Sequence, residues 1–458
     1  MKQNTLKQNT NKFAEWLKKS LTVRMLMVGF LTLILLIPLL FIEDLIRERA
    51  HRQTSVVNEI NKQWGDEVLV YGPMLKIPYK VFKEKKVKDI TTNNEFKEIV
   101  EETNYVYIFP ETLNINSTIN PEEKKRGIYR TSVYNGSVTM SGNFSTPDFK
   151  GLDIDTNNII WDKVIAVLQI SNVKGIKDKI VMNMQGEYPL ASKFSIEKDM
   201  YDGLTMHQLE SKYVNINSIK QQKNESFTLN ININGSEHIQ FIPIGKETTV
   251  NVKSNWKDAN FFGEYLPYNS DKIHKDGFDA KWKVLDINRS FSQQYFNAIP
   301  DLKEFAFGVD FMIPVDEYQK SERSAKYGFL VIGLTFLIFF LIQTLSKINI
   351  HPFQYLMIGL ALTMFYTLLI SISEHSNFLK AYLIAGISVI ALITLYSKTI
   401  LKNIKFPIFI ALSLTALYTF IFVIIQLENY ALLVGSIGLF VILAIVMFVS
   451  KKIDWSNG

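Results

Sequence analysis

The chain of 458 residues contains no cysteine and only six histidines. Without cysteine it can form no disulfide framework, no thiolate nucleophile and no cysteine-ligated metal site. The histidines are scattered, and none stands in the HExxH spacing of a zinc hydrolase. The sequence also lacks a G-x-S-x-G elbow, a P-loop and a G-x-G-x-x-G turn. We therefore predict no catalytic residue, no metal ligand and no cofactor.

The charge balance is only slightly basic, with 50 Lys and Arg against 44 Asp and Glu and a net charge of +6. The basic residues do not form one patch but stand at the ends of apolar segments, which is typical of a membrane topology signal. Aromatic residues in the middle of the chain alternate as in a sheet core and not as in a base-stacking platform. We expect no nucleic-acid partner.

Six apolar segments have about the 20 residues that a helix needs to cross a bilayer. The first, residues 23–42, is not followed by a small-residue cleavage site, so we predict an uncleaved signal anchor, with a cleaved signal peptide as the alternative. Five more follow Tyr327 and are joined by connections too short to fold alone, which predicts an antiparallel bundle. They are Phe329–Leu345, Phe353–Ser371, Ala381–Tyr396, Phe406–Ile425 and Ala431–Val449.

The placement of lysines predicts the orientation of these spans. If the N-terminus lies inside, the inner side receives Lys347, Lys398, Lys402, Lys405, Lys451 and Lys452. This agrees with the positive-inside rule, whereas a miscounted span would put one lysine cluster outside. We expect both termini to be cytoplasmic. The predicted division is a cytoplasmic N-terminus (1–22), the signal anchor (23–42), a large exported domain (43–325), a five-helix bundle (326–452) and a cytoplasmic tail (453–458).

The region between the first and second spans alternates polar and apolar residues in twos, which is typical of strands. Asn135-Gly136 and Asn234-Gly235 predict hairpin turns. A charged helical pattern over Glu43–Gly65 precedes the strands and predicts a juxtamembrane helix. The fold class is thus an integral membrane α-helical protein with a large exported all-β, sandwich-like domain. The expected strand segments are Glu67–Phe82, Asn104–Ile119, Ile128–Phe144, Ser226–Pro243 and Thr248–Trp256.

Several long strings resemble the CreD family of cell-envelope integrity, or colicin-tolerance, inner membrane proteins. They are WGDEVLVYGPMLKIPY (Trp64–Tyr79), RGIYRTSVYNG (Arg126–Gly136), FIPIGKETTVNVKSNWKDANFFGEYLP (Phe241–Pro267) and HPFQYLMIGLALTMFYTLLISISEH (His351–His375). The resemblance implies a bacterial inner membrane protein with a periplasmic domain, linked to envelope integrity and to a two-component response. It implies no catalytic residue. Gln343 departs from the family pattern, in which an acidic residue is more frequent, and this weakens any ion relay there.

Glu374 and His375 form the sharpest candidate site, at the outer end of the third span. A carboxylate beside an imidazole could bind a cation or shuttle protons. The alternative is a polar cap or a contact with the exported domain. Glu428 and Tyr430, in the other outer loop, could join them in one polar cluster.

Other polar residues are weaker candidates. In the third span, Gln354 and Tyr355 are expected near the inner interface, and Tyr366 is expected to hydrogen-bond a neighbouring helix. A structural role is favoured there over a substrate pathway. In the exported domain, Arg126 and Tyr129 could contact a partner, with a strand-edge salt bridge as the alternative.

The sequence therefore predicts a non-enzymatic envelope protein whose helices lie in the lipid bilayer and whose β-domain binds an unidentified envelope partner. One alternative is a transporter or channel for a small solute or ion, although no charge is central in a span. A second is a membrane-embedded enzyme acting on lipid or cell-wall precursors. The oligomeric state stays open.

Overall fold

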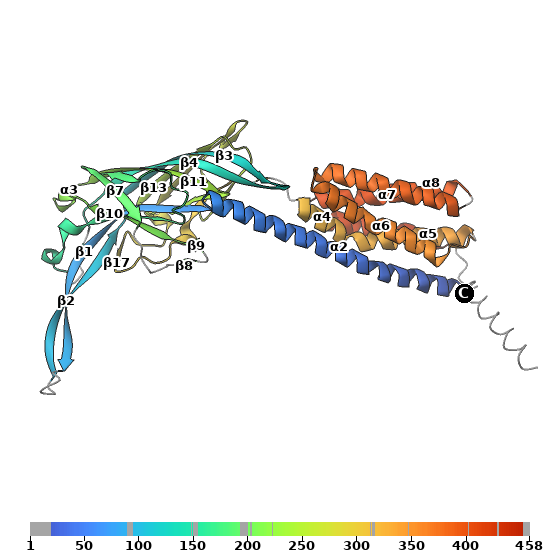
Figure 1. The fold of residues 1–458 in the computed structure, drawn as a ribbon, viewed down its shortest axis with the longest axis horizontal. Coiled ribbons are helices and arrows are strands. Elements are labelled where there is room, and N and C mark those ends of the chain that lie inside the picture. Colours follow the sequence, from blue (N-terminus) through green and yellow to red (C-terminus); the bar gives the residue numbers. More distant parts are fainter. Residues whose placement is uncertain are drawn as a thin grey trace, which may run out of the picture. The chain divides into compact units, whose positions relative to one another are not determined.

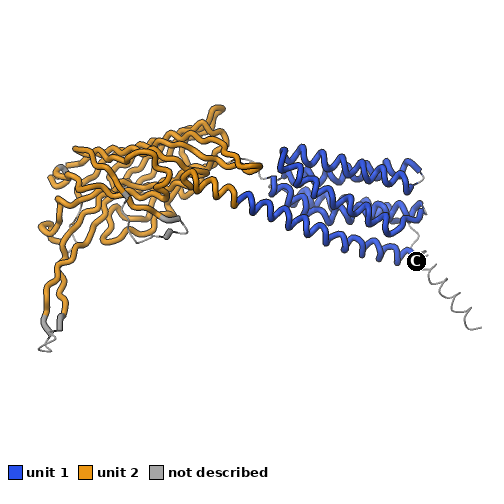
Figure 2. Tube along the Cα trace, viewed as in Figure 1, with its two compact units in different colours: residues 1–54, 315–458 blue, residues 55–314 orange. Residues whose placement is uncertain are grey.

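A computed structural model describes residues 20–88, 95–147, 149, 154–192, 200, 201, 204–221, 223–311, 313, 317–346, 348–401, 403–427 and 430–451. The chain folds into two compact units (Figure 2). One unit, Met1–Thr54 with Val315–Gly458, is called the membrane unit below, and the other, Ser55–Pro314, the β domain.

Helices make up the membrane unit (Figure 1). They are α2 (Leu21–Trp64), α4 (Glu317–Lys326), α5 (Gly328–Ser346), α6 (Pro352–Ser373), α7 (Phe378–Ile400), α8 (Lys405–Gln426) and α9 (Ala431–Ser450). Among the described residues, six of these helices, all except the short α4, are long and apolar enough to cross a membrane. The prediction of six spans, with a β-rich domain between the first and the second, is confirmed.

The first span continues without interruption into the β domain. Helix α2 has 44 residues, which corresponds to about 66 Å at 1.5 Å per residue, twice the thickness of a hydrocarbon core. Its first half is apolar and its second half is charged, as the sequence pattern predicted. The helix ends before Gly65, whose φ of +140° favours glycine. A Cβ at this position would lie only 2.5 Å from the backbone oxygen of Asn234, so a larger residue does not fit.

Two glycines let α2 pack closely inside the membrane unit. A Cβ on Gly359 of α6 would lie 2.0 Å from Cδ1 of Leu35, and a Cβ on Gly328 would lie 2.7 Å from Cδ1 of Leu39. Leu35 and Leu39 are both buried. Close approach through small residues is how helices associate where lipid removes the hydrophobic driving force. The apolar helix α2 is therefore packed into the membrane unit and is not a loose tether.

Besides the end of α2, the β domain contains strands, a short helix α3 (Asn217–Lys220) and several single turns of 3-10 helix. The strands are β1 (Val68–Lys88), β2 (Glu95–Ile108), β3 (Thr112–Arg126), β4 (Tyr129–Phe144), β5 (Ile165–Ile170), β6 (Val181–Asn183), β7 (Glu187–Ser192), β8 (Met200–Tyr201), β9 (Leu204–Thr205), β10 (His207–Tyr213), β11 (Glu225–Ser236), β12 (His238–Phe241), β13 (Glu247–Ser254), β14 (Ala259–Gly263), β15 (Ile273–His274), β16 (Gly277–Leu285), β17 (Gln294–Phe296) and β18 (Phe307–Phe311).

Sixteen of these strands form one continuous sheet in the order β14-β18-β12-β1-β5-β10-β7-β6-β11-β4-β3-β13-β16-β15, with β2 paired to β1 and β17 paired to β2. Strand β7 joins the two halves because it pairs with β10 on one side and with β6 on the other. Most pairings are antiparallel, but β1 pairs with β12, and β3 with β13, in parallel.

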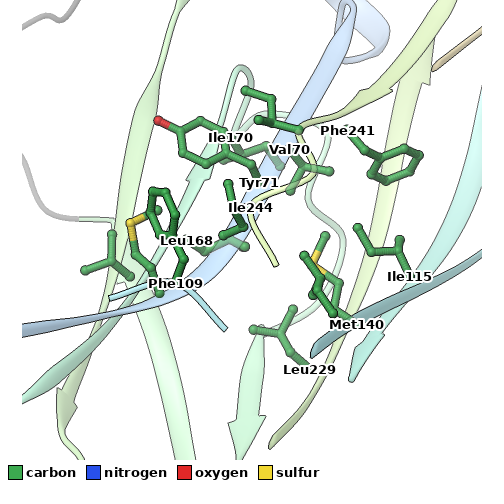
Figure 3. Packing of buried hydrophobic residues seen from close by; sticks show 14 of the residues in the cluster. Val70, Tyr71, Phe109, Ile115, Met140, Leu168, Ile170, Leu229, Phe241 and Ile244 are labelled. Carbon is green, nitrogen blue, oxygen red and sulfur yellow. The ribbon is translucent and has the colours of Figure 1, made fainter. Parts of the chain in front are cut away.

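The two halves of this sheet enclose one hydrophobic core, which makes the domain sandwich-like. Tyr134 of β4 lies 5.2 Å, between ring centroids, from Phe311 of β18, and Trp282 of β16 lies 5.5 Å from Phe307. These strands are far apart in the sheet order, so the contacts are face to face. Figure 3 shows Phe241 of one half and Ile115 of the other among the buried side chains of this core.

Both Asn-Gly pairs lie inside strands, so the two predicted hairpin turns are wrong. Asn135 of β4 is the cross-strand neighbour of Asn234 of β11, and the glycines stand beside them. A Cβ on Gly235 would lie 2.2 Å from the hydroxyl oxygen of Tyr134. The glycine therefore makes room for a buried aromatic ring and does not serve a turn.

Candidate functional site

A polar network surrounds α4 at one end of the membrane unit. We call it the α4 network; its members are Arg47, Arg49, Glu317, Tyr318, Glu322, Lys326 and Glu374. Oε1 of Glu374, at the C-cap of α6, lies 3.7 Å from Nε of Arg49 on α2. The Tyr318 hydroxyl also donates to that oxygen at 3.3 Å. Glu374 thus links α6 to both α2 and α4.

Two further contacts extend this network. Oε1 of Glu322 lies 3.3 Å from Nε of Arg47 on α2 and 3.1 Å from Nζ of Lys326. Hydrogen bonds from Lys326 and Arg47 hold the pKa of Glu322 below its usual value. Oε2 of Glu317 accepts a hydrogen bond from the backbone N–H of Phe378 at 2.8 Å, which satisfies an end group of α7. The network therefore fixes α2, α4, α6 and α7 to one another.

The predicted polar cluster at the ends of the spans is brought together only in part. Glu374 is half-buried in the α4 network, but the side chain of His375 is exposed, and within the described ranges no hydrogen bond or ion pair joins the two. Tyr430 is 65% exposed at the start of α9, and Glu428 lies outside the described residues. Glu374 has structural partners, and the described geometry does not form a carboxylate–imidazole pair.

The polar residues predicted for the third span occupy different environments. Tyr355, in the first turn of α6, is completely buried and donates to Oε1 of Gln343 at 2.9 Å, so its hydroxyl contacts a neighbouring helix. Gln354 caps the start of α6, where its Oε1 accepts from the backbone N–H of His351 at 2.8 Å. Tyr366 is buried against Phe365, with ring centroids 4.9 Å apart. All three positions have structural roles in helix packing or capping.

The sequence analysis did not single out Tyr382 and Tyr418, two further buried tyrosines of the bundle. The hydroxyl of Tyr382 on α7 donates to the backbone oxygen of Tyr418 on α8 at 2.8 Å. Such interhelical bonds contribute of order 1 kcal/mol in a membrane. The one sequence signal for this hydrogen bond is the position of a polar tyrosine within an apolar span.

Arg126 and Tyr129 flank the β3–β4 turn, where Gly127 has a φ of +63°. Nη1 of Arg126 lies 2.9 Å from Oε2 of Glu59 on α2. Tyr129 is buried at 7% exposure. The salt bridge considered as the alternative for Arg126 is present, and a buried Tyr129 offers little surface to a partner.

A cluster of ionisable side chains in the β domain escaped the sequence analysis. We call Glu67, Glu237, His238 and Asp310 the His238 cluster. Nε2 of His238 lies 3.7 Å from Oε1 of Glu67, and its Nδ1 lies 3.5 Å from Oδ1 of Asp310. Burial raises the pKa of the Glu67 and Asp310 carboxyls, against the opposing effect of His238. The sequence contains no local motif for this cluster, because Glu67, the pair Glu237-His238 and Asp310 are far apart in the chain.

A groove of about 750 Å³ lies among α5, α8 and α9 of the membrane unit. Its described lining is apolar apart from Lys405 and a few serines, and includes Leu341, Phe409, Phe420 and Ile442. Such a lining suits acyl chains and gives no polar path for an ion or a hydrophilic solute.

These features define a multi-pass membrane protein with a large β-rich domain between its first and second spans. The family model described as "Inner membrane protein CreD" matches residues 20–456. The Inner membrane protein CreD of Escherichia coli (strain K12) is 27% identical over 442 residues, which cover 96% of this chain and 94% of that protein. The chain belongs to the CreD family of inner membrane proteins.

Proposed function

We propose that this protein acts in cell envelope integrity or in the envelope stress response, without catalysis, by binding an envelope partner through its β domain. The observation that carries the proposal is the continuity of α2 from the first span into the β domain. At its membrane end, Arg47 and Arg49 join α2 to the α4 network. A stiff helix held in this way would pass a displacement of the β domain on to the bundle.

The other end of α2 is equally well fixed within the β domain. The indole Nε1 of Trp64 donates to the backbone oxygen of Tyr134 at 3.2 Å, and Nζ of Lys124 lies 4.8 Å from the centroid of the Trp64 ring. Thr131 donates to Oδ1 of the buried Asn61 at 3.0 Å. These contacts support a role of α2 as a mechanical link, because they oppose rotation of its last turn against the sheet.

We further propose that both termini are cytoplasmic and that the β domain is periplasmic. Lys398, Lys405 and Lys451 flank the ends of α7, α8 and α9 that this orientation puts inside. Arg24, near the start of α2, donates to Oδ1 of Asn349 between α5 and α6, and so belongs to the same end of the unit. Basic residues gathered at one end favour that end as the cytoplasmic one.

The partner surface we favour is the ribbon formed by the outer parts of β1 and β2. Beyond Lys76, β1 no longer pairs with β5 but stays paired with β2, so the two strands leave the body of the sheet together (Figure 1). Phe82 and Ile99 are 54% and 69% exposed on this ribbon. Exposed apolar side chains on a projecting element are typical of a protein-binding site.

The test is complementation of cells that lack the protein, scored by survival under detergent stress. Phe82→Asp and Ile99→Asp should abolish rescue at normal protein levels. Ile287→Asp is the matched control, because Ile287 is an exposed apolar residue elsewhere in the domain, at 85% exposure. Full rescue by both ribbon variants would refute the ribbon as the partner site, and full rescue after deletion of residues 66–314 would refute the role of the whole domain.

The transporter and enzyme alternatives make different predictions. A transporter should move solute in proteoliposomes and lose that flux in Glu374→Gln, whereas the ion pair and hydrogen bond of Glu374 favour a structural role. An enzyme should release a product from lipid or cell-wall precursors and lose this activity in His375→Ala.

A further inference from the structure

The His238 cluster lies at the ends of three neighbouring strands of the β domain, β1, β12 and β18. Glu67 directly precedes β1, whose Val68 pairs with Ile239 of β12, so Glu67 stands next to His238. His238 in turn pairs with Asp310 of β18. Residues opposite one another in a sheet share a face, and Ile239, on the other face, is fully buried in the core. The pleat therefore points the three side chains the same way.

We propose that the His238 cluster is a binding site for a divalent transition-metal ion of the zinc type, with Glu67, Glu237 and His238 as ligands. One ligand atom of each of these residues lies within 4.8 Å of the others. Two ligands bound to a tetrahedral zinc at about 2.0–2.1 Å are roughly 3.4 Å apart. The 3.7 Å between Nε2 of His238 and Oε1 of Glu67 is close to that separation, and Glu237, whose ligand atom lies within 4.8 Å of the others, can join them by rotation of its side chain.

Asp310 gives the imidazole the support that a metal-bound histidine requires. When one ring nitrogen binds a metal, the other usually donates its proton to a carboxylate or carbonyl, which fixes the tautomer. Nδ1 of His238 is buried, has no hydrogen-bond partner within the described part of the chain, and faces Oδ1 of Asp310 at 3.5 Å. A slight rotation of the ring would complete this bond while directing Nε2 towards Glu67.

The cluster is held in place by neighbours that do not compete for the metal. The Tyr134 hydroxyl donates to the backbone oxygen of His238 at 2.7 Å, and the ring of Phe262 packs 5.1 Å from the imidazole. The Thr131 hydroxyl lies 3.3 Å from Oε1 of Glu237 and shares its single proton between this oxygen and Oδ1 of Asn61. The ligands are thus oriented before any ion binds, which lowers the entropy lost on binding.

The charge of the cluster also favours a cation. Glu67, Glu237 and Asp310 bring three carboxyl groups to one imidazole. In the described part of the structure, His238 is the partner in every ion pair that Glu67 and Asp310 make. Half-buried carboxylates this close together repel one another, although His238 and Lys303 act against this at Glu67, and a bound divalent ion relieves the repulsion. The presence of an imidazole favours zinc over calcium or magnesium, which prefer oxygen ligands.

Zinc binding to the full-length protein, purified in detergent and stripped with EDTA, tests the proposal. Titration against a chromophoric zinc chelator should give one zinc per chain. His238→Ala and Glu67→Gln should each weaken this binding at least about tenfold, and Asp310→Asn about 10- to 100-fold. His274→Ala is the matched control, because His274 is an exposed histidine of the same domain and should leave binding unchanged.

Three outcomes would overturn the proposal. They are the absence of zinc binding to the wild-type chain, equal binding by His238→Ala, and calcium binding that depends on Glu67 but not on His238. Glu67→Gln keeps the size of the side chain and decides the question if His238→Ala does not fold. X-ray absorption of the wild-type zinc complex provides a readout free of substitutions, with one imidazole nitrogen and otherwise oxygen ligands expected, and a shell without imidazole contradicting the assignment.

Discussion

Replacing Gly235 with alanine should destabilise the β domain far more than a single methyl group suggests. The new Cβ would lie 2.2 Å from the hydroxyl oxygen of Tyr134 and 2.3 Å from its Cζ, whereas non-bonded carbon atoms prefer about 3.5–4.0 Å. The Tyr134 ring is completely buried, and Phe311 lies against it. The ring has to shift by more than an ångström into a region that is already packed.

Two terms set the expected size of the effect. Overpacking of a core typically costs about 1–3 kcal/mol. A displaced Tyr134 also loses its 2.7 Å hydrogen bond to the backbone oxygen of His238, and an unsatisfied buried group costs about 1–3 kcal/mol. The sum of about 2–6 kcal/mol corresponds to a fall in Tm of about 5–15 °C for a domain of this size.

Tryptophan fluorescence during thermal unfolding of the full-length protein measures this change. Of the six tryptophans, Trp64, Trp161, Trp256 and Trp282 lie in the β domain, so the signal reports chiefly on that domain. A double-mutant cycle supplies the control.

In a Tyr134→Leu background the ring is absent, and Gly235→Ala should then cost at least about 1 kcal/mol less than in the wild type. If the two losses of stability simply add, or if Gly235→Ala alone leaves Tm unchanged, the explanation by ring displacement is wrong.

Three further predictions concern the membrane unit, and each is checked by thermal unfolding of the purified protein. Glu374→Gln should lower the free energy of unfolding by at most about 1 kcal/mol, because the ion pair of Glu374 is partly solvated. His375→Ala should have no measurable effect, because His375 is exposed. Unfolding of either variant would contradict this. Gly359→Leu should cost about 1–3 kcal/mol by forcing α2 away from α6, whereas Gly333→Leu, with open space around it, should cost little; equal effects would disprove the close packing. Because basic partners lower the pKa of Glu322, its ionised form stabilises the fold above about pH 4.5, and this contribution is lost as pH falls through the lowered pKa. Glu322→Gln should flatten that part of the Tm profile, and an unchanged profile would contradict the interaction.

The number and positions of the candidate spans were predictable because they depend on local properties. A span is a run of apolar residues of a given length, and all six runs are present as helices in the described chain. The β-rich character of the region between the first and second spans was predictable for the same reason, since alternation in twos is also local.

The strand order could not be read in the same way, because it depends on pairings between distant segments. Strand β1 pairs in parallel with β12, some 170 residues later, and β3 with β13. Asn135-Gly136 and Asn234-Gly235 have the composition of turns, yet tertiary packing around Tyr134 places them inside strands. A local turn preference of about 1 kcal/mol is easily outweighed by the burial of an aromatic core residue.

The candidate sites show the same difference between local signals, which the sequence reveals, and contacts between distant segments, which it does not. Glu374 was identified because a charge at the end of an apolar span is conspicuous, but its partners Arg49 and Tyr318 come from other helices. His238 was dismissed as an isolated histidine because Glu67 and Asp310 are far away in the sequence. Sheet pairing brings the three together, and only the structure reveals that register.

The side of the membrane on which the β domain lies is the most direct test of the account. The chain has no cysteine, so a single introduced thiol reports on one position. Tyr268→Cys, at a position 68% exposed in the β domain, should react with an impermeant maleimide in intact spheroplasts. Lys451→Cys, at the end of α9, should react only after the membrane is permeabilised. Labelling of Lys451→Cys but not of Tyr268→Cys in intact spheroplasts would contradict the account, because the β domain would then face the cytoplasm and could not meet an envelope partner.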